Sequence, residues 1–124
     1  MIGTVVIVEK PRPNGIGTIK FTWTCTSAGI ATSDETTYVY NAQIKSAWFN
    51  PSSTPTNAYD VTVTDAEGND VLNGLGADLS GTLRVTKTEA NGLATVCSSK
   101  LTLNVTNAGD AMGGIVYLHL LDLS

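Results

Sequence analysis

Charged residues are scarce in this sequence. Asp, Glu, Lys and Arg make up 15% of its 124 residues, whereas roughly 25% is usual for a soluble domain. The seven basic residues are scattered and the formal net charge is −4. Because phosphate binding requires clustered Lys and Arg, the composition argues against nucleic acid as a partner. A Thr-rich surface with little charge suits a protein packed against partners, and equally an ordinary secreted β-domain.

Long apolar runs and strong helix formers are also missing. No apolar stretch approaches the roughly 20 residues that a membrane-spanning helix needs, so we expect no membrane span. Residues 1–10 have no basic region ahead of their apolar run, which favours a strand over a signal peptide. We therefore expect a protein that is kept in a reducing cytosol. Glu, Lys, Gln and Arg are sparse, while Thr, Val, Gly and Asn are common. That mixture is typical of short strands joined by turns.

Cysteine and histidine are nearly absent. The chain has two cysteines, Cys25 and Cys97, and one histidine, His119. In a reducing compartment the cysteines are expected to be buried free thiols, whereas in an oxidising one they could pair. No nucleophile or carboxylate motif surrounds His119, so we expect it to be structural, packed or at a sheet edge. The sequence therefore predicts no catalytic, cofactor-binding or metal-binding residue, and we expect the chain not to be an enzyme.

Three further motifs could carry chemistry, and each has a simpler explanation. The acidic segment Asp65–Asp70 lacks the residue order of an EF-hand loop and is typical of a turn. Segment Gly74–Asp78 has the glycines of a phosphate loop but neither its Lys nor a following helix. The glycosylation triplet Asn104–Thr106 lies in an expected strand, and such triplets arise by chance in a Thr-rich chain.

The segment Asn57–Ser80 has the clearest structural pattern. Apolar and polar side chains alternate along Tyr59–Thr64, which predicts a half-buried strand. Turn formers fill Asp65–Asp70, and Val71 and Leu72 resume the apolar pattern. The segment therefore predicts a tight β-hairpin with a charged tip.

Similar alternation recurs along the rest of the chain. It predicts strands at 4–9, 16–26, 36–50 with a bulge or bend near Asn41, 79–88 and 93–97, and a second hairpin over 101–121. Turn signals recur about every 8–14 residues, which is typical of a sandwich or jelly roll. We therefore expect an all-β, single-domain β-sandwich or jelly roll of about eight antiparallel strands over residues 1–124. Residues 1–10 would be available as an N-terminal arm.

Cys25, Trp48 and Cys97 invite comparison with the immunoglobulin domain, which packs a Trp against a disulfide between its sheets. The separation of the two cysteines fits that domain. However, Trp48 follows Cys25 too late for the next strand, and Thr95 stands where the tyrosine of the corner motif belongs. The immunoglobulin fold therefore remains a minor alternative.

Four segments in the second half of the chain together form a recognisable order of strands and turns. They are a Tyr-Asp-Val-Thr strand with an Asp-x-x-Gly-x-Asp-Val turn (Tyr59–Leu72), a Gly/Ala-rich loop (Gly74–Leu79), a Leu-Thr-Leu-x-Val-x-Asn-Ala-Gly stretch (Leu101–Gly109) and a Val/Tyr/Leu-rich strand (Gly114–Leu120). In these segments the chain resembles small structural proteins of tailed bacteriophages. Pro55–Asn57 also fits, whereas residues 82–99 and the two cysteines lie outside the pattern.

The resemblance implies a virion component, most directly a head decoration or cement protein on the outer surface of the capsid, made in the bacterial cytoplasm. The implied partners are the major capsid protein and further copies of the chain in a homotrimer. A tail or head–tail accessory protein fits the same pattern. An immunoglobulin-like or carbohydrate-binding module for host attachment is the alternative, with Trp48 and Phe49 as the aromatic residues available to a sugar.

Three segments are candidate anchors for such a protein. Lys10–Gly15 and Asn50–Asn57 are proline-bearing loops, and proline limits their freedom before binding, which lowers the ordering cost of docking. Thr4–Val8 is an apolar strand near a terminus, which can add to the exposed sheet edge of a neighbour.

Overall fold

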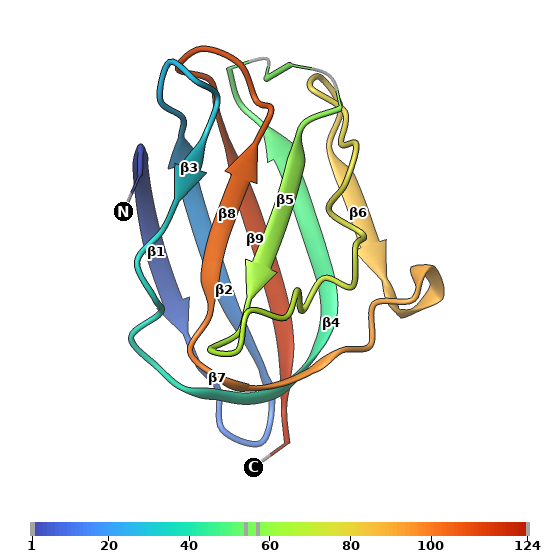
Figure 1. Cartoon of the computed structure of the whole chain (residues 1–124). Coiled ribbons are helices and arrows are strands. Elements are labelled where there is room, and N and C mark those ends of the chain that lie inside the picture. The colour runs from blue at the N-terminus through green and yellow to red at the C-terminus, as the bar shows by residue number, and fades with distance from the viewer. Residues whose placement is uncertain (1, 54, 57, 124) are drawn as a thin grey trace.

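A computed structural model describes residues 2–53, 55–56 and 58–123. Over these residues the chain forms nine strands and one short 3-10 helix, η1 (Glu89–Asn91), in two facing antiparallel sheets (Figure 1). The expected all-β sandwich is confirmed. Met1 of the expected arm, and Thr54 and Asn57 of the expected proline-bearing loop, lie outside the described residues.

The larger of the two sheets has the strand order β1-β2-β9-β4-β6, and β7 pairs with the other end of β4. The smaller sheet has the order β3-β8-β5. The large-sheet strands are β1 (Thr4–Lys10), β2 (Ile16–Thr24), β4 (Tyr40–Pro51), β6 (Val85–Thr88), β7 (Val96–Ser99) and β9 (Gly113–Asp122), and the small-sheet strands are β3 (Ala31–Thr32), β5 (Asp60–Thr64) and β8 (Thr102–Thr106).

After the β1–β2 hairpin, the chain alternates between the two sheets. It passes to β3 in the small sheet, β4 in the large one, β5 in the small one, β6 and β7 in the large one, β8 in the small one and finally β9 in the large one. Strands that follow one another in the sequence therefore face each other across the core. Figure 1 shows this arrangement, with β8 in front of β2 and β9.

The predicted hairpin over 101–121 is wrong, because β8 and β9 belong to opposite sheets. The predicted hairpin of Tyr59–Leu72 is reduced to one bridge, Thr64 with Asp70, and the ladder partner of β5 is β8. In both cases the alternation of apolar residues correctly predicts that one side of the strand is buried. That alternation carries no information about which sheet the strand joins.

Inward side chains of both sheets fill the space between them. The predicted apolar row of β2 and its following residue (Ile19, Phe21, Trp23 and Cys25) is buried, as expected. Trp23 packs against Tyr59, which immediately precedes β5, with ring centroids 5.6 Å apart. Each large apolar side chain that is fully buried contributes about 1.5–3 kcal/mol, so this layer is the main source of stability.

The bulge predicted near Asn41 in fact lies at Lys45, where the register between β4 and β9 shifts between Ile44 and Ser46. Ala42 and Ile44 face the core before the bulge, and Ala47 and Phe49 face it afterwards. An extra residue between Ile44 and Ala47 is needed to keep both on the same side, because side chains alternate along a strand. As a result Ser46 and Trp48 point away from the core.

Residues 4–10, which the sequence leaves available as an arm, are instead the edge strand of the large sheet. β1 pairs with β2 along its whole length, from Thr4 opposite Thr24 to Lys10 opposite Thr18. Val5 is buried in the core. The Glu9 carboxylate accepts hydrogen bonds from the N–H groups of residues 37 and 38 and from the Tyr40 hydroxyl. β1 is thus part of the sandwich, and its removal would expose β2.

Candidate functional site

The side of the large sheet that faces away from the small sheet is covered by no other element of the described chain. We call it the outer face. Strand register and the alternation of burial define its members. They are Thr4, Val6, Val8 and Lys10 of β1, Ile16, Thr18, Lys20, Thr22 and Thr24 of β2, Asn41, Gln43, Ser46, Trp48 and Asn50 of β4, Thr86 and Thr88 of β6, Val96 and Ser98 of β7, and Ile115, Tyr117, His119 and Leu121 of β9.

Three aromatic rings lie together at the centre of the outer face. The register places Trp48 opposite Tyr117 and Ser46 opposite His119. The ring centroids are 5.8 Å apart for Trp48 and Tyr117, 4.9 Å for Trp48 and His119, and 5.1 Å for Tyr117 and His119. These separations are typical of favourable aromatic pairs. We call Trp48, Tyr117 and His119 the aromatic cluster.

The histidine of the aromatic cluster is held by a polar contact as well as by its ring neighbours. His119 Nδ1 lies 2.9 Å from the Ser46 hydroxyl. Burial lowers the pKa of His119 below its ordinary value, because a desolvated imidazolium is disfavoured. The ring is therefore neutral near pH 7. His119 is packed, as expected, but it lies on an interior strand of the sheet rather than at an edge.

Two cations flank the aromatic cluster. Arg84 Cζ lies 5.0 Å from the centroid of the Trp48 ring, in cation–π geometry, an arrangement worth about 0.5–1 kcal/mol at an exposed site. On the opposite side of the cluster, Lys20 of β2 pairs in register with Tyr117. The cluster therefore has an aromatic centre and positive charge at both ends.

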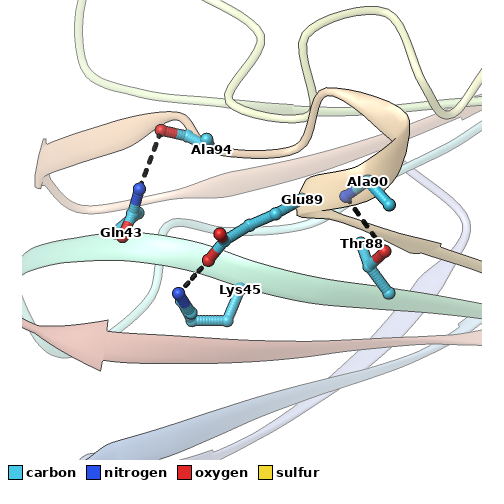
Figure 2. A network of polar contacts seen from close by, with 6 residues as sticks. All are labelled: Gln43, Lys45, Thr88, Glu89, Ala90 and Ala94. Atoms are coloured by element: carbon cyan, nitrogen blue, oxygen red, sulfur yellow. Dashed lines mark hydrogen bonds and ion pairs between the residues drawn. The ribbon is translucent and has the colours of Figure 1, made fainter.

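A polar network fixes the rim of the outer face near the bulge (Figure 2). Lys45, the bulge residue, forms an ion pair with Glu89 of η1. Gln43 Nε2 donates to the carbonyl oxygen of Ala94 at 3.4 Å. Thr88 caps η1, since its Oγ1 accepts from the N–H of Ala90 at 3.3 Å. The carboxylate at this rim is therefore already paired with a cation.

Phe49, one of the two aromatic residues proposed for sugar contact, is wholly buried in the core. The strand alternation explains this, because Trp48 faces outward and its neighbour must face inward. Trp48 keeps its role as a candidate contact residue. Tyr117, His119 and Arg84 join it on the outer face, and their common location follows from the sheet register, which the sequence alone does not reveal.

The acidic turn is a structural element in which the carboxylates of Asp65 and Asp70 accept backbone hydrogen bonds. Asp65 Oδ1 accepts from the N–H groups of Glu67 at 3.0 Å and Asn69 at 2.9 Å. The backbone bond from Asn69 is the main reason why the pKa of Asp65 is lowered. Asp70 accepts from the N–H groups of residues 63, 72 and 74. In the described chain no group of three or more His, Cys, Asp or Glu side chains could hold a metal ion.

The remaining motifs also have structural roles. Segment Gly74–Asp78 lies against the edge of β5, where Val61 N donates to the Gly76 carbonyl oxygen at 2.7 Å. Asn104 lies half-buried in β8, and its Nδ2 donates to Thr64 Oγ1 at 3.4 Å. Both cysteines are buried free thiols, as expected.

A pocket of about 190 Å³ opens at the end of the sandwich where the β1–β2 loop meets the start of β4. Pro11, Arg12 and Pro13 form one wall, and Tyr40 and Leu120 also line it. The ionisable residues among its lining are Arg12, Tyr40 and Asp122. No helix of the described residues has the length and apolar character to cross a membrane.

Comparison with known proteins assigns no family to this chain. No family model matches the sequence, and no curated protein matches it. Among solved structures, a cupin domain from Bordetella pertussis is similar over 97% of this chain and 96% of that chain, at 7% identity and a TM-score of 0.39. Likeness at this level carries no argument about function.

Proposed function

We propose that this chain is a non-catalytic structural protein of a tailed-bacteriophage virion, a decoration protein that binds the outer surface of the capsid and stabilises the shell. The observation that carries the proposal is the resemblance of four segments to small phage structural proteins. In the fold, Tyr59–Leu72 and Leu101–Gly109 contain β5 and β8, Gly74–Leu79 lines the edge of β5, and Gly114–Leu120 lies in β9. The shared pattern thus covers β5 and β8 of the small sheet and most of β9 of the large sheet.

The thiol, imidazole and carboxylate groups named below are buried or take part in structural contacts, which supports a non-catalytic role. Burial raises the pKa of the Cys25 thiol to about 11, so it is protonated and unreactive at neutral pH. His119 is packed between two rings and has no carboxylate or thiol partner in the described chain. The carboxylates of Asp65 and Asp70 accept hydrogen bonds within their own turn.

Exposed apolar side chains along β1 support self-association. Val6 and Val8 of β1 are 56% and 44% exposed at the open edge of the large sheet. An edge strand with such side chains can pair with another chain. We propose that β1 forms one side of the contact between copies in a homotrimer, in which each copy uses two different surfaces and the ring closes after three.

The direct test is binding to capsids. Capsids that lack this protein, from the phage that encodes it, are mixed with the purified chain and sedimented, and the bound chain is quantified by gel densitometry. The proposal expects saturation at a copy number that is a multiple of three and a higher temperature of capsid disruption. Serum albumin serves as the control for trapping. A chain that leaves with the supernatant at every concentration would refute the decoration role.

The aromatic cluster favours a second candidate, a carbohydrate-binding module for host attachment. Trp48 and Tyr117 are half-buried on an outer sheet face, where aromatic rings can stack on sugars. This candidate expects binding to host cells or to their purified polysaccharide, and no binding to capsids. A glycan array with the purified chain separates the two functions.

A further inference from the structure

We infer that the outer face of the large sheet is the surface that docks on the capsid, and that it fits a protein patch which is both apolar and acidic. This inference rests on the proposed function and adds to it the contact surface and the chemistry of the partner.

The composition of the outer face is that of a protein–protein interface. Trp, Tyr and Arg are enriched at the energetic centres of such interfaces, with aliphatic side chains around them and a polar rim. Here Trp48, Tyr117 and Arg84 lie at the centre, and Ile115 and Leu121 lie beside them on β9. At the margin, β6 contributes Thr86 and Thr88, whereas β1 contributes Thr4 and Lys10 together with the exposed valines Val6 and Val8.

The area of the outer face is also close to that of a stable protein–protein interface. The strands of the large sheet range from the 4 residues of β6 to the 12 of β4. At about 3.3 Å per residue and about 4.8 Å between strands, they give a surface of roughly 700 Å² in projection. A stable interface buries about 800 Å² on each partner, measured over a rough surface, so this single face supplies most of what is needed.

The distribution of charge identifies the partner as acidic. The chain has a net charge of −4, yet the outward positions of the large-sheet strands in the described chain include Lys10 and Lys20 and no carboxylate. Arg84 adds a third cation over the Trp48 ring. Glu89 at the rim is paired with Lys45.

The acidic residues gather instead on the small-sheet side, where Asp60 lies in β5 and Asp65, Glu67, Asp70 and Asp78 lie in the turns that follow it. The molecule is therefore polarised, with positive charge on the outer face. An acidic patch approaching that face meets attraction, whereas the small-sheet side repels it.

The geometry of Arg84 favours a protein over a sugar as the occupant. Sugar stacking requires a bare ring face, but the guanidinium of Arg84 covers the Trp48 indole. The other rings of the cluster are packed against one another at 5.1 Å. What the centre presents is a positioned guanidinium, a group suited to carboxylates.

The test is a charge reversal with a matched control. Lys20→Glu with Arg84→Glu reverses the two cations that flank the aromatic cluster. The control, Lys100→Glu with Ala66→Glu and Ala77→Glu, makes the same change in net charge at exposed positions outside the strands of the large sheet. Binding to capsids that lack the protein is measured over a range of salt concentrations. The first variant should bind at least about tenfold more weakly and with less dependence on salt, and the control should bind within about twofold of the wild type.

A second variant tests the aromatic centre. Trp48→Ala, checked for folding by circular dichroism, should also weaken capsid binding by at least about tenfold. Equal binding by the wild type and the Lys20/Arg84 variant would overturn the inference while leaving the decoration role in place. Failure of the wild type to bind capsids would overturn both. Binding of the wild type to a host polysaccharide through Trp48, with no capsid binding, would assign the face to a sugar instead.

Discussion

Cys25 and Cys97 are buried at opposite ends of the large sheet. Cys25 follows Thr24, which pairs with Gly113 at the start of β9. Cys97 pairs with Ala42, which pairs with Asp122 at the end of β9. The length of β9, about 30 Å at roughly 3.3 Å per residue, therefore separates the two cysteines. Because a disulfide needs Cα atoms within about 7 Å, this fold excludes an intramolecular bridge and the immunoglobulin feature that depends on it.

We predict that both thiols are free and slow to react in the native protein. Burial raises the pKa of Cys25 to about 11 and also raises that of Cys97, so little thiolate exists at about pH 8. Titration with a thiol reagent should find slow reaction in the native state and two reactive thiols after denaturation without reductant. Finding no thiol in the denatured, unreduced chain would contradict the separation of the two cysteines along β9.

Gly76 is predicted to be irreplaceable. A Cβ atom at this position would collide with the Val61 carbonyl, and the bond from Val61 N to the Gly76 carbonyl oxygen would be broken. Since the obstacle is backbone, Gly76→Ala should lower the free energy of unfolding by at least about 2 kcal/mol. Urea denaturation measures the loss. Ala77→Ser, at the exposed neighbouring position, is the control and should change stability by less than about 0.5 kcal/mol.

The sequence predicts most strands but not their partners. Alternating residues in β1, β2 and β5 reveal a buried side, and that side is determined locally by the backbone. Pairing is decided by contacts distant in sequence, which is why the local pattern wrongly joins β8 and β9 in one hairpin. The two-residue strand β3 escapes prediction because two residues show no period. Val71 and Leu72, expected to be a strand, are buried in a turn instead.

The candidate surface is even less accessible to sequence reasoning. Trp48 stands out in the sequence beside Phe49, but Tyr117 and His119 reach it from a strand about 70 residues later in the chain. The sequence does carry one usable signal. The inward residues Ala42 and Ile44 are out of phase with Ala47 and Phe49, and that phase change could have located the bulge at Lys45 and the outward direction of Trp48.

His119 should make the folded protein less stable in mild acid. Burial lowers its pKa in the folded state, whereas in the unfolded chain it is expected near about 6.5. Between those two pKa values the unfolded state binds more protons, so stability falls as the pH drops below about 6.5 and levels off below the folded pKa.

The comparison of wild type with His119→Gln isolates this effect, because the carboxylates titrate in both. The difference in melting temperature between about pH 7.5 and pH 5 should be larger for the wild type. An NMR titration of the His119 ring protons provides the direct value. A midpoint at or above about 6.5 would contradict desolvation as the dominant influence on this ring.

The edge of the large sheet should control self-association. Val6 and Val8 point outward from β1 and are 56% and 44% exposed, so lysine at both positions leaves the core intact. Charged side chains on an edge strand oppose pairing with another chain. If β1 mediates the contact between copies, Val6→Lys with Val8→Lys should convert an oligomer to a monomer in light scattering coupled to size-exclusion chromatography.

Leu83→Lys is the control for an added lysine, since Leu83 is also apolar and is 70% exposed outside the strands. It adds positive charge without touching β1 and should leave the oligomer unchanged. The monomeric variant should still bind capsids, because added lysines do not repel an acidic patch, but with lower avidity, since each copy then binds alone. A wild-type chain that is monomeric at all concentrations would refute the homotrimer. A double-lysine variant that stays oligomeric would place the contact on another surface.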